Sequence, residues 1–161
     1  MRCAILTVIV LLGSCGSAKR YNTQMYTYDV QYVDFRTDQV KDMGAVDAAG
    51  AVSAFRSFPF KEQLEKAKTL SEPTFPTISF RSGGDEAVLA VWSLEPDEYE
   101  IYLEQNEQKV TLAVRGEAPA IDAIQSFFNG SRAELYERLA KTTWRRYSAW
   151  YLESTQVSLW R

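Results

Sequence analysis

The feature that most constrains this fold is a run of four apolar-patterned segments in the middle of the chain, separated by short turns. The segments are TISFR (77–81), AVLAVWSL (87–94), YEIYLEQ (99–105) and VTLAVRG (110–116). The loops between them contain Gly, Pro, Asp or Asn, which hairpin turns favour. Strands joined by such short loops pair with their sequence neighbours. The pattern therefore predicts a four-stranded antiparallel meander.

A further strand is predicted before the meander, over residues 25–36. Alternate positions in MYTYDVQYVDFR are apolar or aromatic, with the period of a half-buried strand: Tyr26, Tyr28, Val30 and Tyr32. Val33 and Phe35 take the opposite phase. A bulge or a strand buried on both sides are the two explanations for this change of phase.

Helices are predicted on both sides of the meander. Residues 47–70 favour a short helix to about Arg56, a break at Pro59 and a second helix over about 60–70. After the meander, a helix begins at Pro119 and ends near Gly130. Ser131-Arg132-Ala133-Glu134 matches a capping box and opens another helix. Beyond Lys141 that helix continues, or TQVSLW (155–160) forms a last edge strand.

The element order is therefore β-α-α-β-β-β-β-α-α. Segregation of helices from hairpin strands predicts an α+β fold: an antiparallel sheet of four to five strands, with helices on one face. The 161 residues suit a single domain, which we expect to span residues 25–161.

The N-terminus has the pattern of an export signal. The apolar run Ala4–Leu12 follows Arg2 and rises about 15 Å as a helix, roughly half the thickness of a bilayer core. It is too short to span a membrane but suits the apolar part of a signal peptide. One interpretation is an ordinary signal peptide, cleaved near Ser17 or Ala18.

Leu12-Gly13-Ser14-Cys15 resembles the lipobox of bacterial lipoproteins: an aliphatic residue, two small residues and a cysteine. The resemblance implies removal of residues 1–14 and lipid attachment at Cys15, with residues 15–24 as lipidated cysteine and polar tether. Several acyl chains anchor a protein firmly in a membrane. Gly16 in place of aspartate implies the periplasmic side of the outer membrane.

The amino-acid composition limits the catalytic and metal-binding chemistry that we expect of the domain. The chain has no histidine, and its two cysteines are Cys3 and Cys15. The predicted domain therefore lacks the commonest general base, a thiol nucleophile and a disulfide, so we predict no enzyme activity, no cofactor and no metal. The net charge of −3 predicts no nucleic-acid partner and favours a basic protein as any charged partner.

The strand over 99–105 carries the first candidate site. By alternation, its polar face contains Glu98, Glu100, Tyr102 and Glu104. This acidic stripe is a docking surface for a basic partner or an ordinary solvated sheet face. A carboxylate-dependent cell-wall hydrolase is a third interpretation, but it needs one carboxyl group with a raised pKa.

The segment WRRYSAWY (144–151) carries the second candidate site. Its aromatic and basic side chains, among them Trp144, Arg145, Tyr147 and Trp150, suit a lipid interface beside the anchor. They also suit a contact with a protein partner, because these residue types dominate such contacts. Alternatively, the aromatic residues cover an edge of the core.

These observations favour a lipid-anchored, non-catalytic envelope protein that binds a protein partner. Phe58-Pro59-Phe60 before a helix and Pro76–Phe80 entering a sheet are similar to small bacterial immunity proteins. That resemblance implies neutralisation of a toxin by covering its active site. An envelope lipoprotein that binds a small apolar ligand or supports assembly of a complex is the main alternative.

Overall fold

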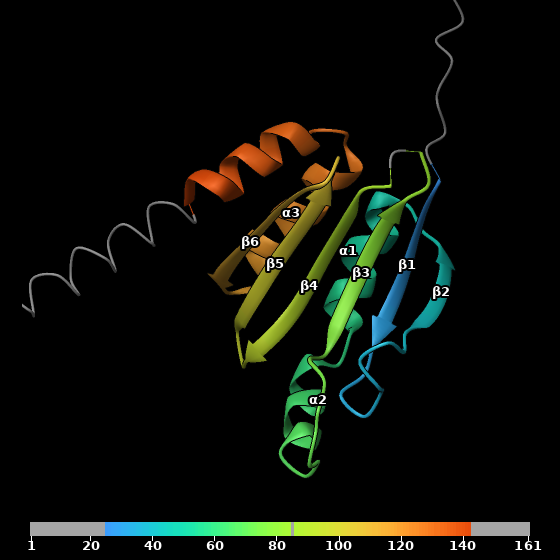
Figure 1. The fold of residues 1–161 in the computed structure, drawn as a ribbon, viewed down its shortest axis with the longest axis vertical. Helices are drawn as coiled ribbons and strands as arrows, with labels where there is room; N and C mark the ends of the chain where they lie inside the picture. Colours follow the sequence, from blue (N-terminus) through green and yellow to red (C-terminus); the bar gives the residue numbers. More distant parts are fainter. Residues whose placement is uncertain (1–24, 85, 143–161) are drawn as a thin grey trace, which may run out of the picture.

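The computed structural model describes residues 25–84 and 86–142, which form an α+β fold with a six-stranded antiparallel sheet (Figure 1). The elements are β1 (Tyr26–Gln31), β2 (Lys41–Ala45), α1 (Ala48–Ser57), α2 (Phe60–Ala67), β3 (Thr77–Ser82), β4 (Val88–Glu95), β5 (Glu98–Gln105), β6 (Gln108–Arg115) and α3 (Glu117–Phe128). A further helix covers residues 132–142.

The predicted meander is confirmed. The strand order is β2-β1-β3-β4-β5-β6, so that β3 to β6 follow one another in the sheet as they do in the chain. Two-residue turns join β4 to β5 and β5 to β6, with positive φ at Asp97 (62°), Asn106 (50°) and Glu107 (65°). Positive φ at both central residues identifies the β5–β6 turn as type I′, whose twist matches paired strands.

The predicted strand over 25–36 is too long, because the chain leaves the sheet after Gln31. The side chain of Val33 is fully buried, its N–H donates to Oε1 of Gln63 in α2 at 3.1 Å, and its carbonyl accepts from Thr74. These contacts turn residues 32–35 away from the sheet. The change of phase at Val33 therefore marks the end of the strand.

The sheet also contains a strand that the sequence did not predict, so the predicted count of four to five strands and the predicted element order match the structure only approximately. β2 forms one edge by pairing with β1, and it has no apolar alternation because its side chains are largely exposed. A bulge places Met43 outside the ladder, and Oδ1 of Asp42 accepts the N–H of Gly44 at 2.8 Å.

The two predicted helices before the meander are confirmed, with the break at Phe58-Pro59. Oδ1 of Asp47 caps α1 by accepting the N–H of Gly50 at 2.7 Å, and α2 ends at Ala67, before the predicted residue 70.

The predicted helices after the meander are also present. α3 begins two residues before Pro119, directly after Gly116 (φ 80°). It ends at Phe128, and Gly130 (φ 78°) follows in the C′ position, where the N–H of Ser131 donates to the carbonyl of Ser126 at 3.1 Å, as in a Schellman motif. The alternative edge strand over 155–160 lies outside the described residues.

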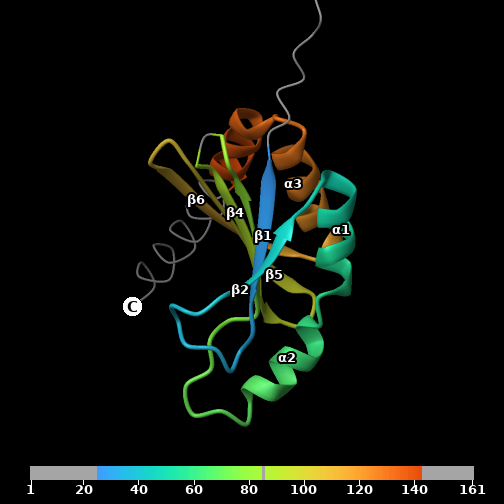
Figure 2. The same ribbon diagram turned by 90° about the vertical axis from the view of Figure 1, so that its right-hand side faces the viewer.

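The hydrophobic core lies between the sheet and the helices. Figure 2 shows α1 and α3 on one side of the sheet. The side chains of β4 and β5 that face them are essentially buried, among them Leu89, Val91, Ile101 and Leu103. Alternate residues on the same strands point to the opposite side, which α1 and α3 do not cover. We call this side of β3 to β6 the open face.

Candidate protein-binding face

The predicted acidic stripe lies on the open face of β5. Glu98, Glu100, Tyr102 and Glu104 are all half-buried, and the residues between them face the core, as alternation predicted. β4 lies along one side of the stripe and β6 along the other. The properties of these four side chains therefore depend on residues from both neighbouring strands.

β4 contributes a tryptophan to the stripe. Trp92 pairs with Glu100 across the two strands, and its indole Nε1 donates to Oε2 of Glu100 at 2.7 Å. The centroids of the Trp92 and Tyr102 rings are 6.3 Å apart, with an angle of 38° between the rings. Two aromatic side chains thus form the middle of the open face. Trp92 is a site residue that was not predicted from the sequence.

Tyr102 is in turn fixed by Glu104. The Tyr102 hydroxyl donates to Oε2 of Glu104, and Nζ of Lys109 on β6 lies 3.3 Å from Oε1. The hydrogen bond from Tyr102 lowers the pKa of Glu104, and the contact with Glu104 raises the pKa of Lys109. Burial, followed by the hydrogen bond to Glu104, raises the pKa of Tyr102. At neutral pH the three groups carry their usual charges.

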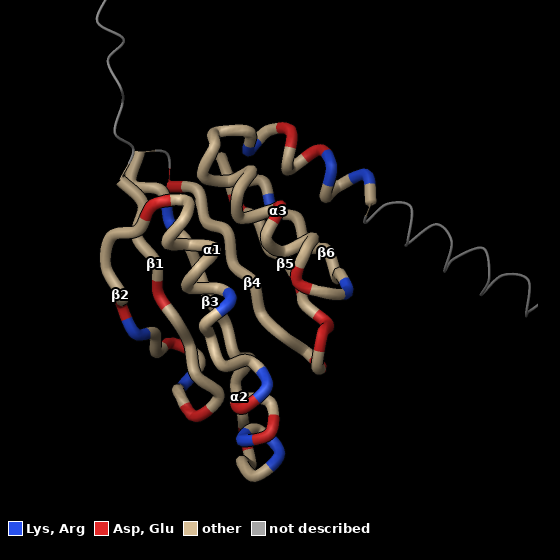
Figure 3. Tube along the Cα trace, turned by 180° about the vertical axis from the view of Figure 1, so that it is seen from behind, with Lys and Arg blue, Asp and Glu red and all other residues tan. Residues whose placement is uncertain are grey.

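Cations from neighbouring strands offset part of the acidic charge. Nη2 of Arg115 lies 3.7 Å from Oε1 of Glu98, and on β3 the Nε of Arg81 donates to Oδ2 of the buried Asp29 at 2.9 Å. The open face therefore combines an aromatic centre with charges of both signs. The helix side is also mixed: acidic and basic residues follow one another along α2 and the helix of residues 132–142 (Figure 3).

Glu104 does not have the property that the acid of a carboxylate hydrolase needs. Such an enzyme needs a carboxylic acid with a raised pKa beside an ionised carboxylate. The pKa of Glu104 is lowered instead, because Tyr102 and Lys109 stabilise its charged form. Among the described residues, no group of three or more acidic side chains could hold a metal ion. The arrangement suits binding better than this type of catalysis.

The remaining predicted site residues lie outside the described part of the chain. These residues are Cys15, Trp144, Arg145, Tyr147 and Trp150. No helix within residues 25–84 and 86–142 is both long and apolar enough to cross a membrane.

An apolar groove beside α2 was also missed by the sequence analysis. It has a volume of about 530 Å³ and lies between α2, the segment before β3 and the end of β4. Phe75 and Leu94 are 58% and 37% exposed, which is high for large apolar side chains, and Leu64 and Pro73 line the same groove. The end of β4 is distant in sequence from the other two segments, so no local pattern indicates the groove. We call it the α2 groove.

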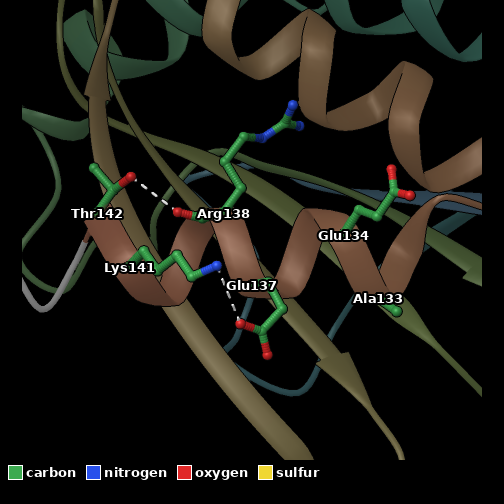
Figure 4. A pocket seen from close by; sticks show the side chains of 6 residues that line it. All are labelled: Ala133, Glu134, Glu137, Arg138, Lys141 and Thr142. Carbon is green, nitrogen blue, oxygen red and sulfur yellow. Dashed lines mark hydrogen bonds and ion pairs between the residues drawn. The ribbon is translucent and has the colours of Figure 1, made fainter.

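A shallower hollow of about 610 Å³ follows the helix of residues 132–142 (Figure 4). Nζ of Lys141 lies 3.7 Å from Oε2 of Glu137, and Thr142 Oγ1 donates to the carbonyl of Arg138 at 2.9 Å. The Arg138 guanidinium pairs with Asp122 of α3 at 2.8 Å. These polar groups are occupied within the chain, so the hollow does not resemble a ligand site.

No protein-family model, curated protein or solved structure matches this chain. Its function is therefore inferred from its own residues and their geometry.

Proposed function

We propose that this chain is a lipid-anchored, non-catalytic protein of the bacterial envelope, and that its domain binds a protein partner through the open face. The observation that carries the proposal is the aromatic pair Trp92 and Tyr102, each of which donates a hydrogen bond to a glutamate of the stripe. Trp and Tyr dominate the energetics of protein interfaces, and a charged rim is typical of them. Side chains fixed before binding lose little conformational entropy on binding.

The partner in this proposal is a basic protein, and a toxin neutralised at its active site is the specific form we propose. Glu98, Glu100 and Glu104 supply three negative charges on one strand, with Lys109 and Arg115 opposite them on β6. The stripe thus keeps an acidic excess. The similarity of 58–60 and 76–80 to immunity proteins supports the toxin as partner.

A site-specific cross-linking experiment tests the open face. A photo-reactive residue replaces Glu98 in one variant and Glu134, on the helix of residues 132–142, in a matched control. We expect a cross-linked protein at position 98 and none at 134. The captured protein, once purified, should bind the full chain at least about tenfold more weakly after Trp92→Ala, the usual cost of losing an interface anchor.

Phe75→Ala is the matched control for that measurement, because Phe75 is an exposed aromatic residue outside the open face. Equal affinity of wild type and Trp92→Ala would refute the assignment of the open face. If only Phe75→Ala weakened binding of the captured protein, the contact would be assigned to the α2 groove instead.

The lipid anchor rests on the lipobox resemblance at Leu12–Cys15. The Cys15→Ser variant should be released from the membrane fraction or accumulate with residues 1–14 still attached. Mass spectrometry of the mature wild-type chain should show an acylated N-terminal residue 15. A wild-type chain that starts at residue 17 or 18 without lipid would favour the ordinary signal peptide.

The α2 groove favours a second candidate function, which is the binding of a small apolar ligand. Its volume suits such a molecule, and Phe75, Leu94 and Leu64 provide apolar walls. The neutral fluorophore N-phenyl-1-naphthylamine should bind with increased emission, and Phe75→Ser should abolish the increase while Trp92→Ala leaves it. No saturable increase for the wild type would exclude this function.

A further inference from the structure

A second pocket opens on the helix side of the sheet, where the ends of several elements meet. It has a volume of about 360 Å³ and lies between the α1–α2 junction, the β4–β5 turn and the start of α3. We call it the aromatic pocket. Leu64 and Pro96 line both this pocket and the neighbouring α2 groove, and the open face lies on the other side of the sheet.

Three buried aromatic rings form its wall. The ring centroids of Phe55, Phe60 and Tyr99 are 5.4 to 5.6 Å from one another, and Phe58 packs on Phe60 at 4.7 Å. Each ring is held by the others and is no more than 8% exposed. The wall is therefore formed before any ligand binds, as in most small-molecule sites.

The Tyr99 hydroxyl is the polar group of this wall. Tyr99 is only 6% exposed, yet no other described residue forms a hydrogen bond with its hydroxyl. Every fully enclosed polar side-chain atom of the described residues does have a partner. The hydroxyl is therefore not fully enclosed, and Tyr99 is one of the residues that line the aromatic pocket. A nearly buried hydroxyl without a protein partner is available to a ligand.

The charges next to this hydroxyl are negative. Burial raises the pKa of Tyr99, and the carboxylates of Glu117 and Asp97 raise it further. These carboxylates come from the start of α3 and from the β4–β5 turn, and neither forms an ion pair with another described residue. Arg56, Lys61 and Glu62 also line the pocket. The lining therefore has three carboxylates and two cations, and this acidic excess favours a positively charged ligand.

We propose that the aromatic pocket binds an organic ammonium group. In this site the Tyr99 hydroxyl accepts an N–H of the ammonium group, and Asp97 and Glu117 balance its charge. The rings of Phe55 and Phe60 contact the attached alkyl chain, as aromatic rings do around cations. The ammonium group belongs to a free amine or to a lysine side chain of another protein. This proposal is independent of the function proposed for the open face.

A titration of the full-length chain in detergent micelles tests the site. The probes are n-butylammonium and n-butanol, which have the same alkyl chain but differ in charge. We expect n-butylammonium to shift the backbone amide resonances of residues 97–99 saturably, and n-butanol to shift them little. Equal binding of the two probes, or no saturable binding of n-butylammonium, would overturn the proposal.

Two variants and a matched control test whether the Tyr99 hydroxyl and the two carboxylates contribute to n-butylammonium binding. Tyr99→Phe, and the double variant Asp97→Asn with Glu117→Gln, should each weaken n-butylammonium binding about tenfold, because each removes a strong polar contact of the cation. Asn is tolerated at the positive φ of residue 97. Glu107→Gln removes a carboxylate from the next turn and should change nothing. If Glu107→Gln weakened n-butylammonium binding as much as the double variant does, general charge attraction would explain the binding and the proposed site would be refuted.

A third probe, Nα-acetyl-lysine methylamide, distinguishes the two sources of the ammonium group. Binding at least as tight as that of n-butylammonium would identify a lysine side chain of another protein as the occupant. Exclusion of this probe, with n-butylammonium still bound, would identify a free amine.

Discussion

The indole Nε1 of Trp92 donates a 2.7 Å hydrogen bond to Oε2 of Glu100 across the β4–β5 pair. A carboxylate acceptor makes this bond stronger than one between neutral groups. It fixes the Trp92 ring beside Tyr102, whose own hydroxyl is bound to Glu104. The glutamates of the stripe therefore orient the aromatic side chains that we propose for binding.

This relationship predicts coupling between Trp92 and Glu100 in the stability of the domain. Trp92→Phe removes the donor and should lower the free energy of unfolding by about 1 kcal/mol. Glu100→Gln keeps an acceptor and should cost less. In the double variant the two single losses should sum to more than the measured loss, because Trp92→Phe already removes the bond that Glu100→Gln weakens. Urea denaturation measures all three, and additive losses would show that the bond contributes nothing.

A second prediction concerns the acid side of the stability curve. The folded-state pKa of Glu104 is lowered from its ordinary value of 4.5, so the folded protein favours ionised Glu104. This contribution is present above the unfolded pKa and is lost as the pH falls through the folded pKa. Glu104→Gln should therefore destabilise the protein at neutral pH and lose its effect at pH values well below 4.5.

Urea unfolding of wild type and Glu104→Gln at a series of pH values measures this difference. Glu134→Gln on the helix of residues 132–142 is the control. A difference between wild type and Glu104→Gln that does not change with pH would contradict the prediction.

The type I′ turn between β5 and β6 predicts a stabilising substitution. Glu107 has φ 65°, a conformation that costs most residues about 1 kcal/mol but glycine almost nothing. Glu107→Gly should therefore raise the melting temperature. Gln108→Gly, one residue later within β6, should lower it, because glycine weakens a strand. Calorimetry distinguishes the two, and a lower melting temperature for Glu107→Gly would be the contrary result.

Ser93 is predicted to stabilise the bulge at the end of β4. Its buried hydroxyl donates to the carbonyl of Glu95 at 3.0 Å, and the carbonyl of Glu98 lies 3.2 Å away. Ser93→Ala leaves these acceptors without the hydroxyl and should cost about 1 kcal/mol of unfolding free energy. Ser53→Ala, on an exposed position of α1, should cost nothing. Equal effects of both substitutions in denaturant unfolding would argue against this role.

The meander could be predicted from the sequence because the turn residues and the alternation that determine it are short-range sequence features. Pro96-Asp97 and Asn106-Glu107 define tight turns, and alternation defines the buried face of each strand. The same alternation placed Glu98, Glu100, Tyr102 and Glu104 on one face correctly. β2 could not be found in this way, because an exposed edge strand buries no alternate residues and so lacks the pattern.

The partners of the stripe could not be predicted, because the register depends on a bulge. A regular two-residue turn would place Ser93 opposite Glu100, but the irregularity at Leu94 places Trp92 there and turns Leu94 outward. The aromatic pocket was beyond prediction for a different reason. It joins Phe55, Tyr99 and Glu117, which are distant in sequence and meet only through tertiary packing.

The irregular edge of β2 affects how copies of a membrane-anchored protein can associate with one another. Lipid anchors concentrate proteins in two dimensions, where exposed strand edges can join neighbouring molecules into continuous sheets. In β2, however, the bulge at Met43 interrupts the ladder and Asp42 already occupies the N–H of Gly44. A neighbouring strand would find no regular row of donors and acceptors there. With Cys15 anchored as we propose, this edge would let many copies share one membrane without polymerising through it.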